Sequence, residues 1–299
     1  MERKLLWVIS SIVILILWFK IEPQDTQQAD TNLASSEPVQ GEPPAQKRTQ
    51  SSREANVSKE EQEYFQSHPI DGSRPDFAAI SDVQERKAVF FDFLMPFVTE
   101  KNDLLLKDRA RIEAILNSPE PPSREDKTWI AALRNIHKLR KLGVYTHEDI
   151  AVLLRYVDVI PASLVLAQAA NESAWGTSRF ALEGNNYFGQ WCFTPGCGLV
   201  PNARGEEQDH EVRKFSDARE SVFAYIDNLN SNSAYKELRS IRAQLRKEGE
   251  AITGLALVHG LENYSQRGQD YIDEIESLID YNELWRFNVH TDEATYNNE

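Results

Sequence analysis

The stretch Pro161-Ala-Ser-Leu-Val-Leu-Ala-Gln-Ala-Ala-Asn-Glu-Ser-Ala-Trp-Gly176 places a single carboxylate, Glu172, near the end of an otherwise apolar segment. Proline is favoured in the first turn of a helix, where its missing N–H group has no helical partner. Side chains recur at three- and four-residue spacing along this segment, at Leu164, Val165, Gln168, Ala169 and Glu172. This spacing predicts a helix that presents Gln168 and Glu172 on one face, and Gly176 is expected to end it in a left-handed conformation.

Glu172 has a plain interpretation and a chemical one. Taken alone, it is a partly solvated residue at a helix end. With Trp175 as a large apolar neighbour, its carboxyl is expected to be buried, and burial raises the pKa of a carboxyl. A general acid needs such a pKa if it is to carry a proton near neutral pH. We therefore predict that Glu172 is a general acid and that Gln168 and Trp175 line its substrate site.

Composition bounds the class of protein. The chain has 299 residues, 41% of them hydrophobic and 27% charged, which is typical of one main globular domain with some disordered chain. The formal net charge of -14 argues against a nucleic-acid partner, because no basic stripe is available to contact phosphates. A metal or other cofactor is not expected. His147 and Glu148 suggest half of a zinc motif, but the position that requires a second histidine is Ala151.

The N-terminal segment predicts a membrane anchor. Residues 5–19 are almost continuously apolar, with Arg3 and Lys4 before them and Lys20 after them. No small-residue cleavage site follows, so residues 1–20 are interpreted as an uncleaved signal anchor with its N-terminus in the cytoplasm, and a cleaved signal peptide is the alternative. Residues 21–60 are rich in polar residues and proline and are expected to form a disordered linker. Residues 286–299 are expected to form a disordered tail.

Helical periodicity dominates the rest of the chain. In the N-terminal helical region, residues 61–145, it predicts helices over 82–116, where Pro96 should introduce a kink, and over 127–142. A third helix should begin at Thr146. A short strand is expected around residues 211–215, and Ser216 is expected to cap the next helix. Three further helices are expected over 235–247, 250–259 and 268–281.

Cys192-Phe-Thr-Pro-Gly-Cys197 follows the opening stretch and contains the chain's two cysteines. Proline and glycine predict a tight hairpin with a cysteine at each end. In an exported protein, two cysteines at such a spacing are expected to form a disulfide, whereas a metal site would need more ligands.

Four ordered motifs together resemble the bacterial glucosaminidase family, glycoside hydrolase family 73, and within it the Bax-type proteins of Gram-negative bacteria. The resemblance reaches from about Arg86 to Ile279. It is carried by Ala-Ala-Asn-Glu172-Ser-Ala-Trp-Gly-Thr-Ser, Asn185-Asn-Tyr-Phe-Gly, Phe215-Ser-x-x-x-Glu-Ser-Val-x-x-Tyr225 and Tyr264-Ser-x-x-Gly-x-x-Tyr271. It implies a mainly α, lysozyme-like α+β domain with a small β-hairpin lobe, which we assign to residues 146–285.

The resemblance also implies roles for single residues. The family's catalytic acid corresponds to Glu172, and Tyr264 corresponds to a tyrosine of the substrate cleft, which we group with the catalytic residues. The floor of the cleft corresponds to Asn186, Tyr187 and Phe188. The chain departs from the family pattern at Asn171, where Leu or Ala is usual, and at Gln190, where Lys is usual. Either difference could alter affinity or bond choice, but neither removes the acid.

Together, these observations predict a peptidoglycan hydrolase that cleaves the β-1,4 bond after N-acetylglucosamine at the periplasmic face of the inner membrane. A carboxylate that activates water is expected from the lobe, among Glu206, Glu207, Asp209 and Glu211, with the substrate's own 2-acetamido group as the alternative. A lytic transglycosylase or an amidase-type wall hydrolase on a related fold, or a non-catalytic glycan-binding module, are the rival interpretations.

Overall fold

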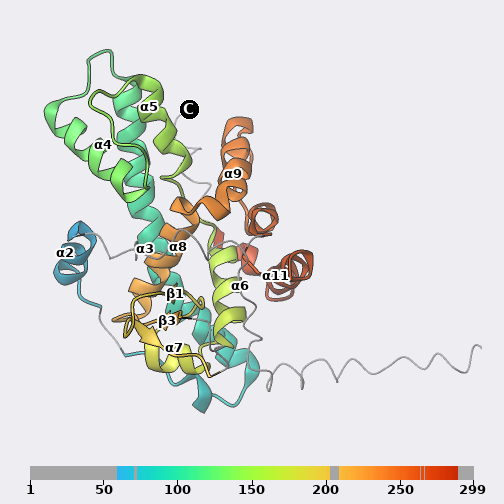
Figure 1. Cartoon of the computed structure of the whole chain (residues 1–299). Helices are drawn as coiled ribbons and strands as arrows, with labels where there is room; N and C mark the ends of the chain where they lie inside the picture. Colours follow the sequence, from blue (N-terminus) through green and yellow to red (C-terminus); the bar gives the residue numbers. More distant parts are fainter. Residues whose placement is uncertain (1–58, 71–72, 203–208, 263, 266, 289–299) are drawn as a thin grey trace, which may run out of the picture. The chain divides into compact units, whose positions relative to one another are not determined.

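The computed structural model describes residues 59–70, 73–202, 209–262, 264–265 and 267–288 (Figure 1). These residues are mainly helical and include one small sheet. In chain order the elements are α2 (Lys59–Ser67), η1 (Phe77–Ala79), α3 (Val83–Asn117), α4 (Arg124–Ile136), α5 (His147–Ala151), η2 (Val152–Arg155), α6 (Ala162–Ser173), α7 (Arg179–Gly184), β1 (Trp191–Cys192), β2 (Gly198–Leu199), β3 (Glu211–Arg213), α8 (Ala218–Ser231), η3 (Ser233–Tyr235), α9 (Lys236–Glu248), α10 (Gly254–Leu257), η4 (Val258–Leu261), α11 (Gln269–Tyr281) and η5 (Leu284–Asn288).

The predicted anchor, residues 1–20, lies outside the described residues. Within the described ranges, no helix is both long enough and apolar enough to cross a bilayer. Most of the predicted linker, residues 21–60, is also outside them, but its last two residues belong to α2. This helix is held by Glu61, which pairs with Lys101 of α3 at 3.0 Å, and by Phe65, whose ring lies 5.1 Å from that of Phe223 in α8.

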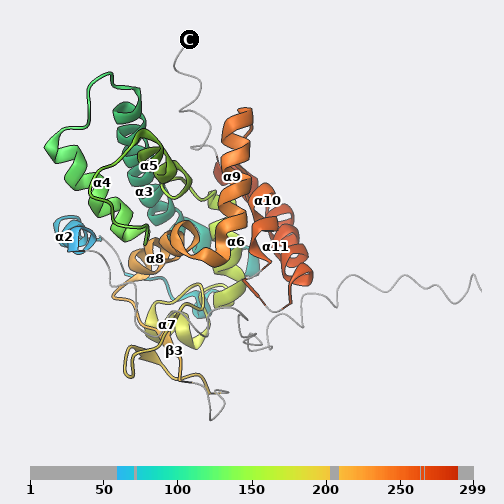
Figure 2. The same ribbon diagram turned by 45° about the horizontal axis from the view of Figure 1, so that its top comes forward.

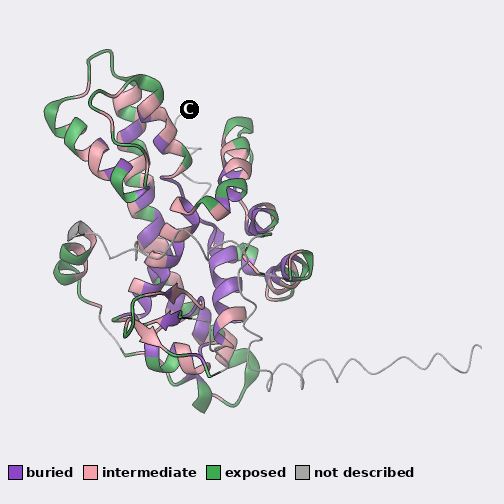
Figure 3. Ribbon diagram, in the orientation of Figure 1, coloured by how far each residue is buried: buried purple, intermediate pink, exposed green. Residues whose placement is uncertain are grey.

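Helix α6 lies at the centre of the helical part and packs against α3, α10, α11 and η5 (Figures 1 and 2). Most of its residues are buried, and Figure 3 shows α6 mainly in the colour of buried residues. Helix α3 is capped at its N-terminus by Asp82, whose carboxylate accepts a hydrogen bond from the Glu85 amide at 2.8 Å, and the helix continues through Pro96 without interruption. The predicted helix over 82–116 is confirmed.

The front helices share their core with the rest of the chain. One hydrophobic cluster contains fully buried side chains from α3, α4, α6, α8 and α11, among them Phe90, Ile130, Leu166, Ile226 and Ile275. The sequence separates a helical region, 61–145, from a domain that begins at 146. In the part of the chain that the structure describes, buried side chains from both sides of that boundary belong to one hydrophobic cluster, because the apolar face of α3 is buried against α6 and α8.

The lobe differs from the predicted hairpin. The strands β1 and β2 do not pair with each other. Instead, β3 lies between them and is antiparallel to both, so that Val212 is opposite Trp191 on one side and Leu199 on the other. Gly198 permits this close pairing, because a Cβ atom there would lie 2.0 Å from the carbonyl oxygen of Val212. The lobe is therefore a three-stranded sheet completed by a later segment.

Several helix boundaries also differ from the prediction. Helix α4 ends at Ile136 and not at residue 142, because Lys138 adopts a left-handed φ of 56°. The chain after the helix is held by the buried guanidinium of Arg134, which donates to the carbonyls of Arg140 and Asp149. The predicted helix over 250–259 is two short pieces, α10 and η4.

The cap of α8 and the C-terminal boundary are corrected as well. Asp217, not Ser216, caps α8, by accepting from the Glu220 amide at 2.8 Å, while Ser216 donates to the Glu220 carboxylate. The first three residues of the predicted tail, 286–288, belong to η5, which continues to Asn288, and residues 289–299 lie outside the described residues. The Asn288 side chain accepts a hydrogen bond from the backbone of Ser163 in α6 at 3.0 Å.

Candidate functional site

Glu172 lies in the last turn of α6, and the chain reverses directly after it. The helix ends at Ser173 with Ala174 as its left-handed C-cap, so the left-handed stop comes two residues before the predicted one at Gly176. Ala174, Trp175 and Gly176 all have left-handed φ angles, of 48°, 58° and 78°. Residues other than glycine adopt this conformation at an energetic cost, so the surroundings must hold it in place. The Ser173 hydroxyl contributes by accepting from the Gly176 amide at 2.9 Å and donating to the Ala169 carbonyl at 2.6 Å.

The carboxyl of Glu172 is surrounded by protein although the residue keeps some exposed surface. Its Oε1 atom accepts a hydrogen bond from the hydroxyl of Tyr271 in α11 at 2.9 Å. Its Oε2 atom lies beside Gly189, 3.7 Å from the position of a Cβ atom at that glycine. Burial raises the pKa of Glu172 from 4.5 to about 7, the Tyr271 bond lowers it, nearby Glu274 raises it and Arg267 lowers it. Near neutral pH, a large fraction of this group therefore carries a proton.

Three tyrosines and one glutamine lie around the acid. Gln168 donates to the Tyr271 oxygen at 2.9 Å, and Tyr225 of α8 donates to the Gln168 side-chain carbonyl. Tyr264 stacks on Tyr271 with ring centroids 5.3 Å apart and donates to the Phe188 carbonyl at 3.0 Å. Burial and the nearby Glu172 raise the pKa of both Tyr264 and Tyr271 well above 10, so both phenols stay protonated and can donate.

The structure confirms that Gln168 and Glu172 lie on one face of α6, because both bond to Tyr271. Gln168 is fully buried, and its predicted role in lining the substrate site stays a prediction. The sequence did not predict that Tyr271 contacts Glu172. Tyr271 belongs to the same motif as Tyr264 and lies on the apolar face of the helix predicted over 268–281, and this position indicates a buried side chain.

Residues 186–188 are buried and lead into Gly189, which lies beside Glu172. The Asn186 side chain is 1% exposed and forms a closed set of bonds, donating to the carbonyls of Gln190 and Arg213 and accepting from the amides of Phe188 and Gln190. Tyr187 packs against Phe90 and Phe93, and Phe188 stacks on Tyr225 at 4.0 Å. These side chains are buried and support the backbone around Gly189, and their predicted role as the floor of the substrate cleft stays a prediction.

Trp175 packs mainly against α3. Its ring lies 5.9 Å from that of Phe90 and 5.5 Å from that of Phe91, and the Lys87 ammonium lies 4.8 Å from its centroid. Trp175 is partly exposed, so its predicted role in substrate binding stays a prediction.

Two of the four lobe carboxylates can be described. Glu206 and Glu207 lie outside the described residues. Asp209 is exposed and precedes β3. Glu211 is buried, and its two oxygens accept from the amides of Gly196 and Gly198 at 2.9 and 2.7 Å. Glu211 therefore holds the turn that leads into β2, and this leaves it poorly placed to activate water.

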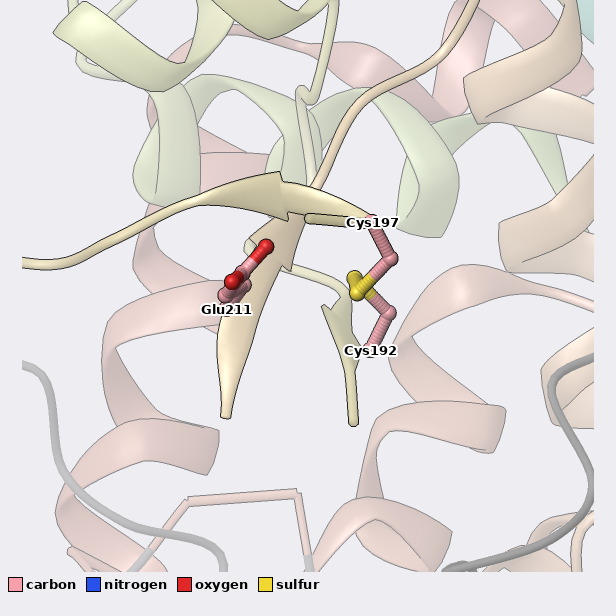
Figure 4. Close-up of side chains that lie close together, drawn as sticks. All are labelled: Cys192, Cys197 and Glu211. Carbon is pink, nitrogen blue, oxygen red and sulfur yellow. A yellow bond between two sulfur atoms is a disulfide. The ribbon is translucent and has the colours of Figure 1, made fainter. Parts of the chain in front are cut away.

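The predicted disulfide is present between Cys192 and Cys197, with the Cα atoms 6.2 Å apart. Figure 4 shows Glu211 beside it. The two sulfurs and the carboxylate come within 4.8 Å of one another, a grouping that could suggest metal ligands. The two sulfurs are bonded to each other and the carboxylate accepts hydrogen bonds from backbone amides, so the group stabilises the turn between Cys192 and Gly198.

Comparison with known proteins places this geometry in context. Residues 149–284 match the family model described as glucosaminidase, mannosyl-glycoprotein endo-beta-N-acetylglucosaminidase. The chain is also 34% identical over 225 residues to "Protein bax" of Escherichia coli (strain K12), and the match covers 74% of this chain and 79% of that protein. No solved structure matches the chain. The range that matches the family model, 149–284, contains Gln168, Glu172, Tyr225, Tyr264 and Tyr271.

Proposed function

The chain belongs to the Bax-type proteins with a glucosaminidase domain, and on that premise we propose that it hydrolyses the glycan strands of peptidoglycan with Glu172 as the general acid. The observation that carries the proposal is the environment of this one carboxyl. Its pKa of about 7, raised mainly by burial, keeps a proton available near neutral pH. Glycosidases need such a group beside the bond that they cleave.

In the proposed reaction, Glu172 donates its proton to the glycosidic oxygen as the bond from that oxygen to the sugar C1 breaks. A water molecule then adds to C1 and gives its proton to a base. Because Glu211 is engaged by the Gly196 and Gly198 amides, Asp209, Glu206 and Glu207 are the better lobe candidates for that base. The 2-acetamido group of the substrate is the alternative, since it can attack C1 without any second carboxylate.

The bond proposed for cleavage is the β-1,4 bond after N-acetylglucosamine. Residues 1–20, as the predicted signal anchor, would hold the enzyme at the periplasmic face of the inner membrane, from which it can reach peptidoglycan. Tyr264, which bonds to the Phe188 carbonyl beside Gly189, is proposed to shape the same side of the cleft.

The product end tests this proposal. Purified peptidoglycan is digested with the full-length chain, reduced with borohydride and analysed by mass spectrometry, and fragments ending in reduced N-acetylglucosamine are expected. Ends of 1,6-anhydro-N-acetylmuramic acid would identify a lytic transglycosylase, and reduced N-acetylmuramic acid a muramidase. Peptides released from intact glycan would identify an amidase. Sedimentation with the wall without any product would indicate a binding module, and the Glu172→Gln variant controls for contaminating activity.

A further inference from the structure

Four buried or half-buried side chains from three helices form one continuous series of hydrogen bonds. It runs from Tyr225 in α8 through Gln168 in α6 and Tyr271 in α11 to Glu172 in α6. Tyr225 and Tyr271 are 1% and 2% exposed and Gln168 is fully buried, so water does not compete for these bonds. In the proposed reaction, Glu172 touches the substrate, while Tyr225 and Gln168 have no part so far.

The donors and acceptors in this series can be ordered from the chemistry of each group. A phenol has one proton, and an amide has a carbonyl that only accepts and an NH2 group that only donates. Tyr225 donates to the Gln168 carbonyl, which turns the NH2 group of Gln168 toward the Tyr271 oxygen. The Tyr271 oxygen therefore receives a hydrogen bond from Gln168, and its own proton is directed at Oε1 of Glu172.

This order has a consequence for the acid itself. Oε1 of Glu172 is occupied as an acceptor from Tyr271, so the proton that Glu172 carries belongs on Oε2. Oε2 is the oxygen that lies beside Gly189. If Glu172 donated from Oε1 to Tyr271, the Tyr271 proton would lose this acceptor, and Gln168, the other hydrogen-bond partner of Tyr271, presents an NH2 group that only donates. A buried hydroxyl proton without an acceptor is unfavourable.

We propose that Tyr225 and Gln168 are positioning residues that act through Tyr271 to keep the transferable proton of Glu172 on Oε2. The proposal rests on the role of Glu172 in the proposed function. It assigns Tyr225 an effect on catalysis although Tyr225 makes no hydrogen bond to Glu172. Without the Tyr225 hydroxyl, the Gln168 amide is free to turn over, and its carbonyl then takes the Tyr271 proton away from Glu172.

The first test uses the Tyr225→Phe and Tyr271→Phe variants of the full-length chain, each of which removes one oxygen atom. In both, the carboxylate of Glu172 loses its donor, so the alkaline limb of the pH–rate profile is expected to move upward by about half a pH unit or more. We expect kcat to fall about tenfold or more with KM within about twofold. Because both changes act through one hydrogen bond, the double variant is expected to be no slower than Tyr271→Phe alone.

Tyr235→Phe is the matched control. Tyr235 is a buried tyrosine whose ring lies 6.1 Å from that of Tyr264, but its side chain bonds to Asn228, which is not one of the four groups of the series. This variant is expected to keep the pH profile, and its kcat is expected to stay within about twofold of the parent. If Tyr235→Phe changed the pH profile and kcat as much as the other two variants do, the changes would reflect a general destabilisation of the site, and the proposal would be overturned.

A second measurement does not depend on activity. With glutamate labelled with 13C at the side-chain carboxyl, the signal missing from Glu172→Gln identifies Glu172, and its titration is followed by NMR. The midpoint is expected to rise in Tyr225→Phe and Tyr271→Phe and to stay unchanged in Tyr235→Phe. A folded Tyr225→Phe protein with an unchanged midpoint and unchanged kcat overturns the proposal. Absence of glycan cleavage by the parent, with the expected NMR shifts, overturns the proposed function alone.

Discussion

The carboxyl of Glu172 differs from that of an ordinary glutamate because the fold surrounds it with protein and places the hydroxyl of Tyr271 beside it as a hydrogen-bond donor. Burial and the hydrogen bond act in opposite directions, and burial prevails, so the pKa rises from 4.5 to about 7. Asp158 shows the opposite balance. Burial would raise its pKa, but Arg242, Arg246 and Arg109 surround it and hold the pKa below its usual value.

The raised pKa of Glu172 predicts a pH-dependent effect of Glu172→Gln on stability. The native state binds this proton more tightly than the unfolded chain does, so the wild type loses stability as pH rises from about 4.5 to about 7, and glutamine removes that loss. We expect the melting temperatures of the two proteins to agree near pH 4 and the variant to be more stable at pH 8, by at most about 3 kcal/mol. Calorimetry across this pH range measures the difference, and a variant that is less stable at pH 8 would contradict the burial argument.

For Asp158, removal of the charge is expected to lower the stability of the protein, whereas Glu172→Gln is expected to raise it at pH 8. It is 1% exposed, bonds to Arg246 at 2.7 Å and Arg109 at 3.2 Å, and lies 3.7 Å from the fully buried Arg242. Removing one partner of a buried ionic group leaves uncompensated charge, so Asp158→Asn is expected to cost about 3 kcal/mol or more, as urea unfolding at pH 7 would measure. The lowered pKa means that the wild-type contribution is present above pH 3.8 and disappears as pH falls through the native pKa. The difference between the two proteins should therefore shrink in acid, and a constant difference would contradict this account.

At the scale of elements, the lobe depends on three short strands and the contacts that join them. The disulfide closes the turn between Cys192 and Cys197, and Glu211 on the central strand holds the same turn through the Gly196 and Gly198 amides. The helices depend on similar long-range contacts. For example, Arg134 fixes the end of α4 by bonding to the Asp149 carbonyl in α5.

Because the disulfide and Glu211 hold one turn, their effects should not add. Glu211→Gln is expected to speed the hydrogen exchange of the Gly196 and Gly198 amides. The paired Cys192→Ser and Cys197→Ser change is expected to cost about 2 kcal/mol or less, since the closed loop is short. In a double-mutant cycle the combined loss should differ from the sum of the two losses by about 0.5 kcal/mol or more. The control is Asp209→Asn, a change at an exposed residue near Glu211, and it should alter none of these quantities. If the two losses of stability simply add, the disulfide and Glu211 stabilise different parts of the lobe.

At the scale of the whole molecule, the helices before residue 146 complete the core around α6. Phe90, Leu94 and Val98 of α3 are fully or almost fully buried in the same cluster as the α6 side chains. Lys101 of α3 also pairs with Asp227 of α8 at 2.9 Å, and its pKa is raised by these acidic neighbours in spite of its burial. The front region is thus part of the folded unit that positions Glu172.

This shared core predicts the outcome of truncation. A chain limited to residues 146–285 exposes the apolar surface that α3 covers, and it is expected to lack a cooperative thermal transition. A chain of residues 59–288 retains α2, α3 and η5 and is expected to melt cooperatively, with a midpoint close to that of the full-length protein. Circular dichroism and calorimetry on the two fragments decide this, and a stable, active 146–285 fragment would show that the front helices are dispensable.

The sequence by itself determined what depends on neighbours along the chain. The periodicity of apolar residues predicted α3, α6 and α11 closely, and the spacing of Gln168 and Glu172 placed them on one face of a helix. The Cys192–Cys197 pair was predictable for the same reason, because its two sulfurs are only five residues apart. The recurrence of family motifs predicted the mainly helical class.

The tertiary structure alone decided what depends on distant segments. The donor to Glu172 comes from Tyr271, 99 residues away, and the acid's pKa comes from burial beneath several elements. The order of the sheet, the occupation of Glu211 by backbone amides and the burial of Asn186 likewise arise from segments that meet only after folding. Local patterns specify which face of an element is apolar, whereas hydrogen-bond partners and desolvation are fixed only when those faces pack together.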